Sequence, residues 1–209
     1  MKPKDIPFVP SHEKGGFHDT ESRVEIDSDL VNEKFEILKA RFLDVNSWQE
    51  ISAIGASEFK LYSNEGKPVS RAPMIGDKMR IDVPGPGGTQ SKGYDWTDII
   101  DYREFENKEK DEFCILFTSR PTNPPEQEKE NYVAHFYGPD ATSTAMITKG
   151  KNYLIASVHG RNEIPNTQKT TWLDAIRNFL FASGGIMGVG KIQWKLLTEG
   201  LVKDLGVHS

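Results

Sequence analysis

The residues that could do chemistry gather on one predicted strand, from Gly93 to Phe105. Alternation with a period of two is typical of a β-strand, and both faces of this one mix apolar with polar side chains. A purely dry core is therefore not indicated. One face is predicted to present Trp96, Asp98, Ile100, Tyr102 and Glu104, and neighbouring strands are predicted to add Arg120, Tyr132, His135 and Tyr153.

Two kinds of chemistry fit this set of side chains. A cavity lined by aromatic rings with a few polar groups suits the binding of a small molecule. A carboxylate buried in such a cavity, Asp98 or Glu104, would have a raised pKa and could act as an acid or a base. Ordinary cross-strand pairs and solvated charges would give the same pattern, so this third interpretation stays open.

The stretch from Trp172 to Leu205 must form the element that covers the strands. Its apolar residues recur in steps of three and four, which predicts one buried stripe on a long helix. The middle of the stripe is small, and each glycine there weakens a helix by about 1 kcal/mol relative to alanine. This notch would either leave room for a ligand or allow close packing. The helix is predicted to give the cavity Phe179, Ser183, Met187, Gly190 and Trp194.

The order of the other elements predicts an α+β fold with an antiparallel sheet. A first strand is expected at 22–30, a helix from Val31 to about Asp44, and a second short helix that carries Trp48. Residues 1–21 are expected to form an extended N-terminal arm, and residues 22–209 a single domain. Strands are then predicted at 58–63, 77–83, 93–105, 112–120, 131–137, 142–148 and 152–159.

This order of elements resembles a known superfamily. The matching residues are the strand Arg23–Leu30, the following VNEKFEILKARFLDVNSWQEI, and the closing WKLLTEGLVKDLG. They are similar to the START-like, or SRPBCC, proteins, which include pollen-allergen-like proteins and polyketide cyclases. The resemblance implies a helix-grip fold, in which a curved antiparallel sheet wraps around a long C-terminal helix, with two short helices after the first strand. It also implies an internal cavity between the sheet and that helix.

Several motifs that would assign other chemistry are incomplete. The string from Gly185 to Lys191 matches G-x-x-x-x-G-K, but Ile192 replaces the Ser or Thr of a phosphate-binding loop, and no strand precedes it. The five histidines lack metal-ligand spacing, so no metal and no cofactor are expected. Cys114 lies in an apolar run and is expected to be a buried core residue.

Composition narrows the partners further. The formal net charge of −5 argues against a nucleic-acid binder, and no apolar run is long enough to span a membrane. The first residues lack the apolar core of a signal peptide, so a cytoplasmic monomer or homodimer is expected.

The leading hypothesis is the binding of an apolar or aromatic small molecule, lipid- or polyketide-like, in the cavity under the last helix. A cyclase, dehydrase or hydrolase that uses acid and base residues in the same cavity is the alternative. A third possibility is a protein-interaction module that makes contact through the loops at 84–93 and 121–130.

Overall fold

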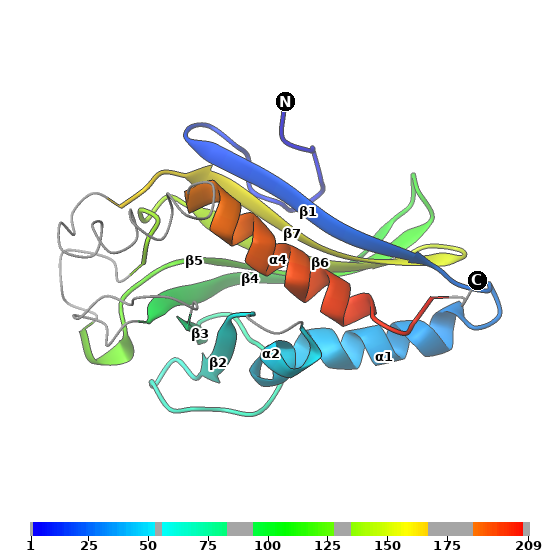
Figure 1. The fold of residues 1–209 in the computed structure, drawn as a ribbon, viewed down its shortest axis with the longest axis horizontal. Helices are drawn as coiled ribbons and strands as arrows, with labels where there is room; N and C mark the ends of the chain where they lie inside the picture. Colours follow the sequence, from blue (N-terminus) through cyan, green and yellow to red (C-terminus); the bar gives the residue numbers. More distant parts are fainter. Residues whose placement is uncertain (1, 53–55, 83–93, 128–134, 167–185, 207–209) are drawn as a thin grey trace.

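A seven-stranded antiparallel sheet forms the centre of the molecule (Figure 1). The computed structural model describes residues 2–52, 56–82, 94–127, 135–166 and 186–206, with the side chains of all of these except 186–190. The strand order across the sheet is β1-β7-β6-β5-β4-β3-β2, so β1 and β2 form its edges. The strands are β1 (Gly16–Glu25), β2 (Glu58–Tyr62), β3 (Lys78–Asp82), β4 (Asp95–Asn107), β5 (Glu112–Pro121), β6 (Thr142–Lys149) and β7 (Tyr153–Glu163).

The helices pack on one side of this sheet, which we call the inner face (Figure 1). In the described part of the chain they are α1 (Val31–Leu43), the short α2 (Trp48–Ile51) and the C-terminal α4 (Ile186–Val202). Short 3-10 turns occur at Val45–Ser47 and Pro125–Gln127. Both long helices are amphipathic, and their apolar stripes face the sheet because water is excluded there.

The C-terminal helix confirms the end of the predicted stripe. Leu197, Leu201 and Leu205 are each at most 3% exposed, and they share one core with α1 and the inner faces of the strands. Trp48 fills the middle of this core, where its ring lies 5.8 Å from that of Phe117 and its Nε1 donates to the carbonyl of Phe42. The predicted α+β class and helix-grip arrangement are confirmed. Residues 172–185 of the predicted helix lie outside the described residues.

Strand β1 differs from its prediction. It runs from Gly16 to Glu25 and not from 22 to 30. Its beginning was not predicted because the inward positions before Val24 carry polar side chains, which give no apolar alternation. Residues 16–21, expected in an arm, therefore belong to the sheet. The division into an arm and a single domain otherwise stays a prediction.

The segment before β1 lies across the opposite, outer face of the sheet (Figure 1). Ile6 and Phe105 pack against a small cluster of Cys114, Leu116 and Met146, and the rings of Phe8 and Phe105 meet edge to face at 4.8 Å. Cys114 is 3% exposed, as predicted, and burial raises the pKa of its thiol. This N-terminal segment is thus a cover for the outer face.

The later strands differ from prediction at their ends. Strand β7 continues four residues beyond His159, which brings Arg161 and Glu163 into the sheet. Of the strand predicted at 131–137, residues 131–134 lie outside the described part, and Tyr137 makes only an isolated bridge with Pro165. The loop at 84–93 lies outside it too, as do residues 128–130 of the second predicted contact loop.

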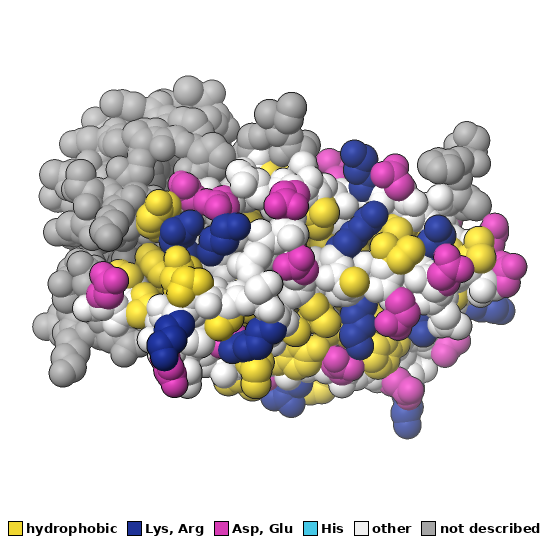
Figure 2. Space-filling model, turned by 90° about the horizontal axis from the view of Figure 1, so that it is seen from below, with side chains coloured by type: hydrophobic (Ala, Val, Ile, Leu, Met, Phe, Trp, Pro, Cys, Tyr) yellow, Lys and Arg dark blue, Asp and Glu magenta, His cyan; other side chains and the backbone are white. Residues whose placement is uncertain are grey.

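The surface that carries α1 and α2 mixes both signs of charge. Figure 2 shows lysine and arginine side chains interspersed with aspartate and glutamate, with apolar side chains between them. Within the described part of the chain, no helix is long and apolar enough to cross a bilayer.

Candidate functional site

A β-bulge divides the residues predicted to share one face of β4. Ile99 pairs with Ser119 and Asp101 pairs with Thr118, so Ile100 has no residue opposite it. The extra residue reverses the alternation. Tyr102 and Glu104 therefore lie on the inner face, whereas Trp96 and Asp98 lie on the outer face. The single polar face predicted from the sequence is not found.

The inner-face pair of β4 sits at the rim of the sheet. The Tyr102 hydroxyl donates to Glu104 Oε1 at 2.7 Å, and Lys39 of α1 lies 3.8 Å from the same oxygen. Burial, with the hydrogen bond to Glu104, raises the pKa of Tyr102 to about 12. The Glu104 side chain is 41% exposed, so the burial on which its predicted acid–base role rested is absent.

The other predicted residues lie apart from this pair. Asp98 binds Lys78 Nζ at 2.8 Å on the outer face, where Arg120 is exposed and directly opposite it. Tyr153, also on the outer face, donates to Glu112 and lies under the guanidinium of Arg23. His135 is buried and accepts from the backbone N–H of Tyr137. Tyr132, Phe179 and Ser183 lie outside the described residues, and only the backbone of Met187 and Gly190 is described.

Trp194 is the predicted residue that leads to a site. Its half-buried indole packs on Phe59 with the ring centroids 6.0 Å apart. On its other side is the imidazole of His18, which is parallel to the indole within 13° at a centroid distance of 6.5 Å. Trp194 thus connects the helix core to a polar group on β1.

His18 and Glu163 form a buried pair at the ends of β1 and β7. His18 Nδ1 and Glu163 Oε1 are 2.9 Å apart, and each side chain is only 3% exposed. The two side chains lie over Gly160, where a Cβ atom would overlap both His18 Nδ1 and Glu163 Oε1. A glycine at this position of β7 therefore makes room for the pair. Burial raises the pKa of Tyr137, and the charge of Glu163 adds to this shift.

The second ring nitrogen of His18, Nε2, differs from Nδ1 in its hydrogen bonding. With Glu163 ionised and His18 neutral, Nδ1 donates to the carboxylate and Nε2 is an acceptor, because a carboxylate only accepts hydrogen bonds. Nε2 is buried and has no hydrogen-bond partner among the residues that the structure describes. Buried polar atoms normally have a partner, so one that lacks it marks a place where another molecule can bind.

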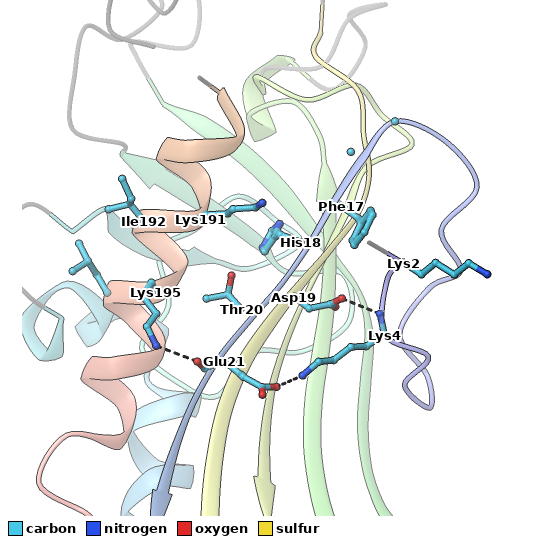
Figure 3. Close-up of a pocket in the computed structure, with 13 residues that line it drawn as sticks. Lys2, Lys4, Phe17, His18, Asp19, Thr20, Glu21, Lys191, Ile192 and Lys195 are labelled. Atoms are coloured by element: carbon cyan, nitrogen blue, oxygen red, sulfur yellow. Dashed lines mark hydrogen bonds and ion pairs between the residues drawn. The ribbon is translucent and has the colours of Figure 1, made fainter. Parts of the chain in front are cut away.

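His18 lines a cleft of about 1240 Å³ between β1 and α4 (Figure 3). Ile192 and Leu196 contribute to the helix side, whereas Phe17, which also lines the pocket, projects from β1 on the side away from α4 (Figure 3). In Figure 3 the His18 ring extends from β1 toward α4, beside Lys191. The cleft therefore combines apolar surface with the imidazole of His18 and four lysines, Lys2, Lys4, Lys191 and Lys195.

Two polar contacts hold α4 against the free edge of β1 at one end of this cleft. Lys195 Nζ donates to the carbonyl of Glu21 at 3.2 Å, and the hydroxyls of Ser22 and Thr198 are 2.9 Å apart. These contacts fix the spacing of the strand and the helix. At this end of the cleft, the separation of β1 and α4 is thus set by contacts between regular elements.

A second polar network lies on the outer face, under the N-terminal segment. His159 binds Asp19 Oδ1 through Nδ1 at 2.8 Å and Ser157 Oγ through Nε2 at 3.0 Å. The order Ser–His–Asp is that of a nucleophilic triad. Arg161 also binds Asp19, however, and the backbone of Lys4 closes over both residues, so the network anchors this segment to the sheet.

The charges of this network shift the pKa values of two members. Burial alone would raise the pKa of Asp19, but hydrogen bonds from Lys4 N, His159 and Arg161 lower it below the ordinary value. Burial lowers the pKa of His159. The network is therefore stable with a neutral imidazole and an ionised carboxylate.

Sequence reasoning missed both members of the buried pair in the cleft. His18 was assigned to the N-terminal arm, and Glu163 lay beyond the end of the strand predicted at 152–159. One signal for the start of β1 was available in the sequence, because two consecutive glycines, Gly15 and Gly16, indicate a turn, and a strand can begin directly after a turn. The distance along the chain between the two residues gave no reason to join them.

Comparison with known proteins finds distant structural similarity alone. No family model and no curated protein sequence matches the chain. The Zhui aromatase/cyclase from Streptomyces sp. R1128 is similar at 13% identity and a TM-score of 0.40, with 92% of this chain and 99% of that chain covered. Norcoclaurine synthase from Thalictrum flavum is similar at 7% identity and a TM-score of 0.36, with 96% of this chain and 99% of that chain covered. Major latex-like protein 151 from Panax ginseng is similar at 10% identity and a TM-score of 0.35, with 86% of this chain and 97% of that chain covered.

The chain has a helix-grip fold. The fold is assigned from the order of the strands in this sheet and from the position of α4, because structural similarity at TM-scores below 0.5 is too distant to assign it. Such low identities assign no activity, so a function for this helix-grip protein rests on its own residues.

Proposed function

We propose that this protein binds an apolar or aromatic small molecule in the cleft between β1 and α4. The observation that carries the proposal is His18, which lines the cleft and has a buried Nε2 without a partner among the described residues. A ligand with a hydroxyl or N–H group would satisfy it. An unmet buried acceptor is destabilising by about 1–3 kcal/mol, so a ligand that meets it gains affinity.

The walls of the cleft support an apolar body for this ligand. Ile192 and Leu196 of α4 present apolar surface, and Ile192 is 52% exposed although it is a large aliphatic side chain. Burial of such surface contributes about 25 cal/mol per Å². Small-molecule sites combine apolar side chains with placed polar groups. In this cleft the apolar side chains lie beside His18 and four lysines.

The experiment uses 8-anilinonaphthalene-1-sulfonate, an aromatic anion whose fluorescence rises in apolar surroundings. We expect a saturable rise and an affinity at least about tenfold lower in Ile192→Glu, which places a carboxylate in the cleft and repels the sulfonate. The matched control is Ile37→Glu, because Ile37 is also an exposed isoleucine on a helix but does not line the cleft. Absence of saturable binding, or equal loss in both variants, would refute the proposal.

The acid–base enzyme is a second candidate, and one observation favours it. The carboxylates first considered, Asp98 and Glu104, lie on different faces of β4. The pair of His18 and Glu163 is buried, hydrogen-bonded and next to the cleft. An enzyme of this fold would therefore use a histidine and not a lone carboxylate as its base.

A further inference from the structure

The structure assigns His18 as a general base that removes a proton from an apolar or aromatic substrate in the cleft, with Glu163 as its positioning residue. This inference rests on the proposed binding of such molecules between β1 and α4. The substrate class is a carbon acid or a hydroxyl compound whose acidic hydrogen reaches Nε2. The reaction class is proton abstraction, followed by elimination or rearrangement within the substrate.

Two buried histidines on opposite faces of the sheet, His18 of β1 and His159 of β7, can be compared with each other. His159 has partners on both ring nitrogens, Asp19 and Ser157, as expected of an imidazole that holds structure together. His18 has a carboxylate on Nδ1 and no partner on Nε2 among the described residues. Both histidines are at most 4% exposed, so burial does not explain the difference.

The geometry of the pair suits a base. Hydrogen bonding to Glu163 holds the proton on Nδ1, so the lone pair of Nε2 is available. When Nε2 takes up a proton, the imidazolium is stabilised by the carboxylate 2.9 Å from Nδ1. Both side chains are 3% exposed, and charges interact more strongly where water is excluded.

The surroundings keep the base in one orientation. Gly160 provides the space over which both side chains pack, and the Trp194 indole lies parallel to the imidazole on the side of α4. A base whose direction is fixed before the substrate arrives loses little entropy in the reaction.

A chemical probe with a balanced reaction tests this assignment. In 5-nitrobenzisoxazole a base removes the proton on C3, the C–H electron pair completes a nitrile, and the ring N–O bond breaks to release a coloured phenolate. In the protein the proton goes to His18 Nε2 and then to solvent. No oxidant, reductant or second reactant is required.

We expect the wild-type protein to accelerate this elimination with saturation kinetics. His18→Gln should lower kcat by about 100-fold or more, the contribution typical of a positioned general base. Glu163→Gln should lower kcat at least about tenfold with little change in KM, because its amide can donate to Nδ1 and favour the wrong tautomer. His12→Gln is the matched control, since His12 lies in the N-terminal segment outside the cleft, and it should retain the full rate.

The results separate this inference from the proposed function. Circular dichroism and binding of the anilinonaphthalene probe establish that each variant is folded and has an intact cleft. If the wild type binds that dye but does not accelerate elimination, or if His18→Gln keeps the rate, the base assignment is wrong and the binding proposal stands. Loss of the rate in Lys191→Gln but not in His18→Gln would make a lysine amine the base and overturn the assignment.

Discussion

Replacing Gly200 by alanine tests how closely α4 packs on α2. Gly200 is buried in α4, and a Cβ atom there would overlap the carbonyl group of Ile51 and the Cα of Ser52. In an isolated helix this substitution would be stabilising by about 1 kcal/mol. Overpacking of a tight contact costs typically about 1–3 kcal/mol. Because the obstructing atoms are backbone and cannot rotate away, we take the upper value, which leaves a net loss of about 2 kcal/mol.

Urea unfolding followed by far-ultraviolet circular dichroism measures this loss. Gly138→Ala is the control, since a Cβ at Gly138 would meet the carbonyl oxygen of Ile164 at an ordinary 3.7 Å. We expect the midpoint for Gly200→Ala to fall well below those of the control and the wild type. A Gly200→Ala protein as stable as the wild type, or more so, would refute the packing, because helix propensity alone would then decide the sign.

Three further predictions concern the core, the cleft and the outer-face network. Leu197→Ala should lower the free energy of unfolding by about 2–5 kcal/mol, since Leu197 is 1% exposed, and a neutral urea melt would remove it from the core. Gly160→Ala should displace the buried pair that it supports and abolish elimination of the benzisoxazole probe; an unchanged rate would contradict that geometry. Stability should decrease from about pH 7.5 to about pH 5, because burial lowers the pKa of His159 below its ordinary 6.5 and the unfolded chain takes up the proton first. A urea midpoint that is constant over this range, or the same decrease in His159→Asn, would show that the imidazole is not responsible.

Apolar periodicity predicted most elements because their burial is one-sided. Helix α1 has buried Val31, Phe35, Leu38 and Phe42 at helical spacing, and it begins and ends within a residue or so of its expected limits. The strands from β2 to β6 likewise alternate or form apolar runs between turns. In these segments local sequence and tertiary packing favour the same structure, so the pattern was sufficient.

The bulge in β4 could not be predicted from periodicity. A period of two assumes that every residue has one opposite it, and Ile100 does not. One unmatched residue reverses the faces of everything after it. Trp96 and Asp98 were therefore predicted beside Tyr102 and Glu104, although they lie on the other side of the sheet.

The start of β1 was missed for a chemical reason. Its inward positions hold His18, Thr20 and Ser22, and the partners of His18 and Ser22 lie far away in the chain, on β7 and α4. Polar residues with distant partners give no local signal of burial. The most reactive part of the candidate site was thus the least visible in the sequence.

Two consecutive residues of strand β1 take part in different networks on opposite faces of the sheet. His18 turns toward the cleft, whereas Asp19, the next residue, binds Arg161 and the N-terminal segment on the far side of the sheet. Side chains alternate, so a slip of one residue along β7 would exchange the two and break both networks together. The N-terminal segment that covers the outer face therefore helps to fix the register of β1, and with it the position of His18 in the cleft. Deletion of the first few residues would remove the contact with Asp19 and so disturb His18 on the opposite face of the sheet.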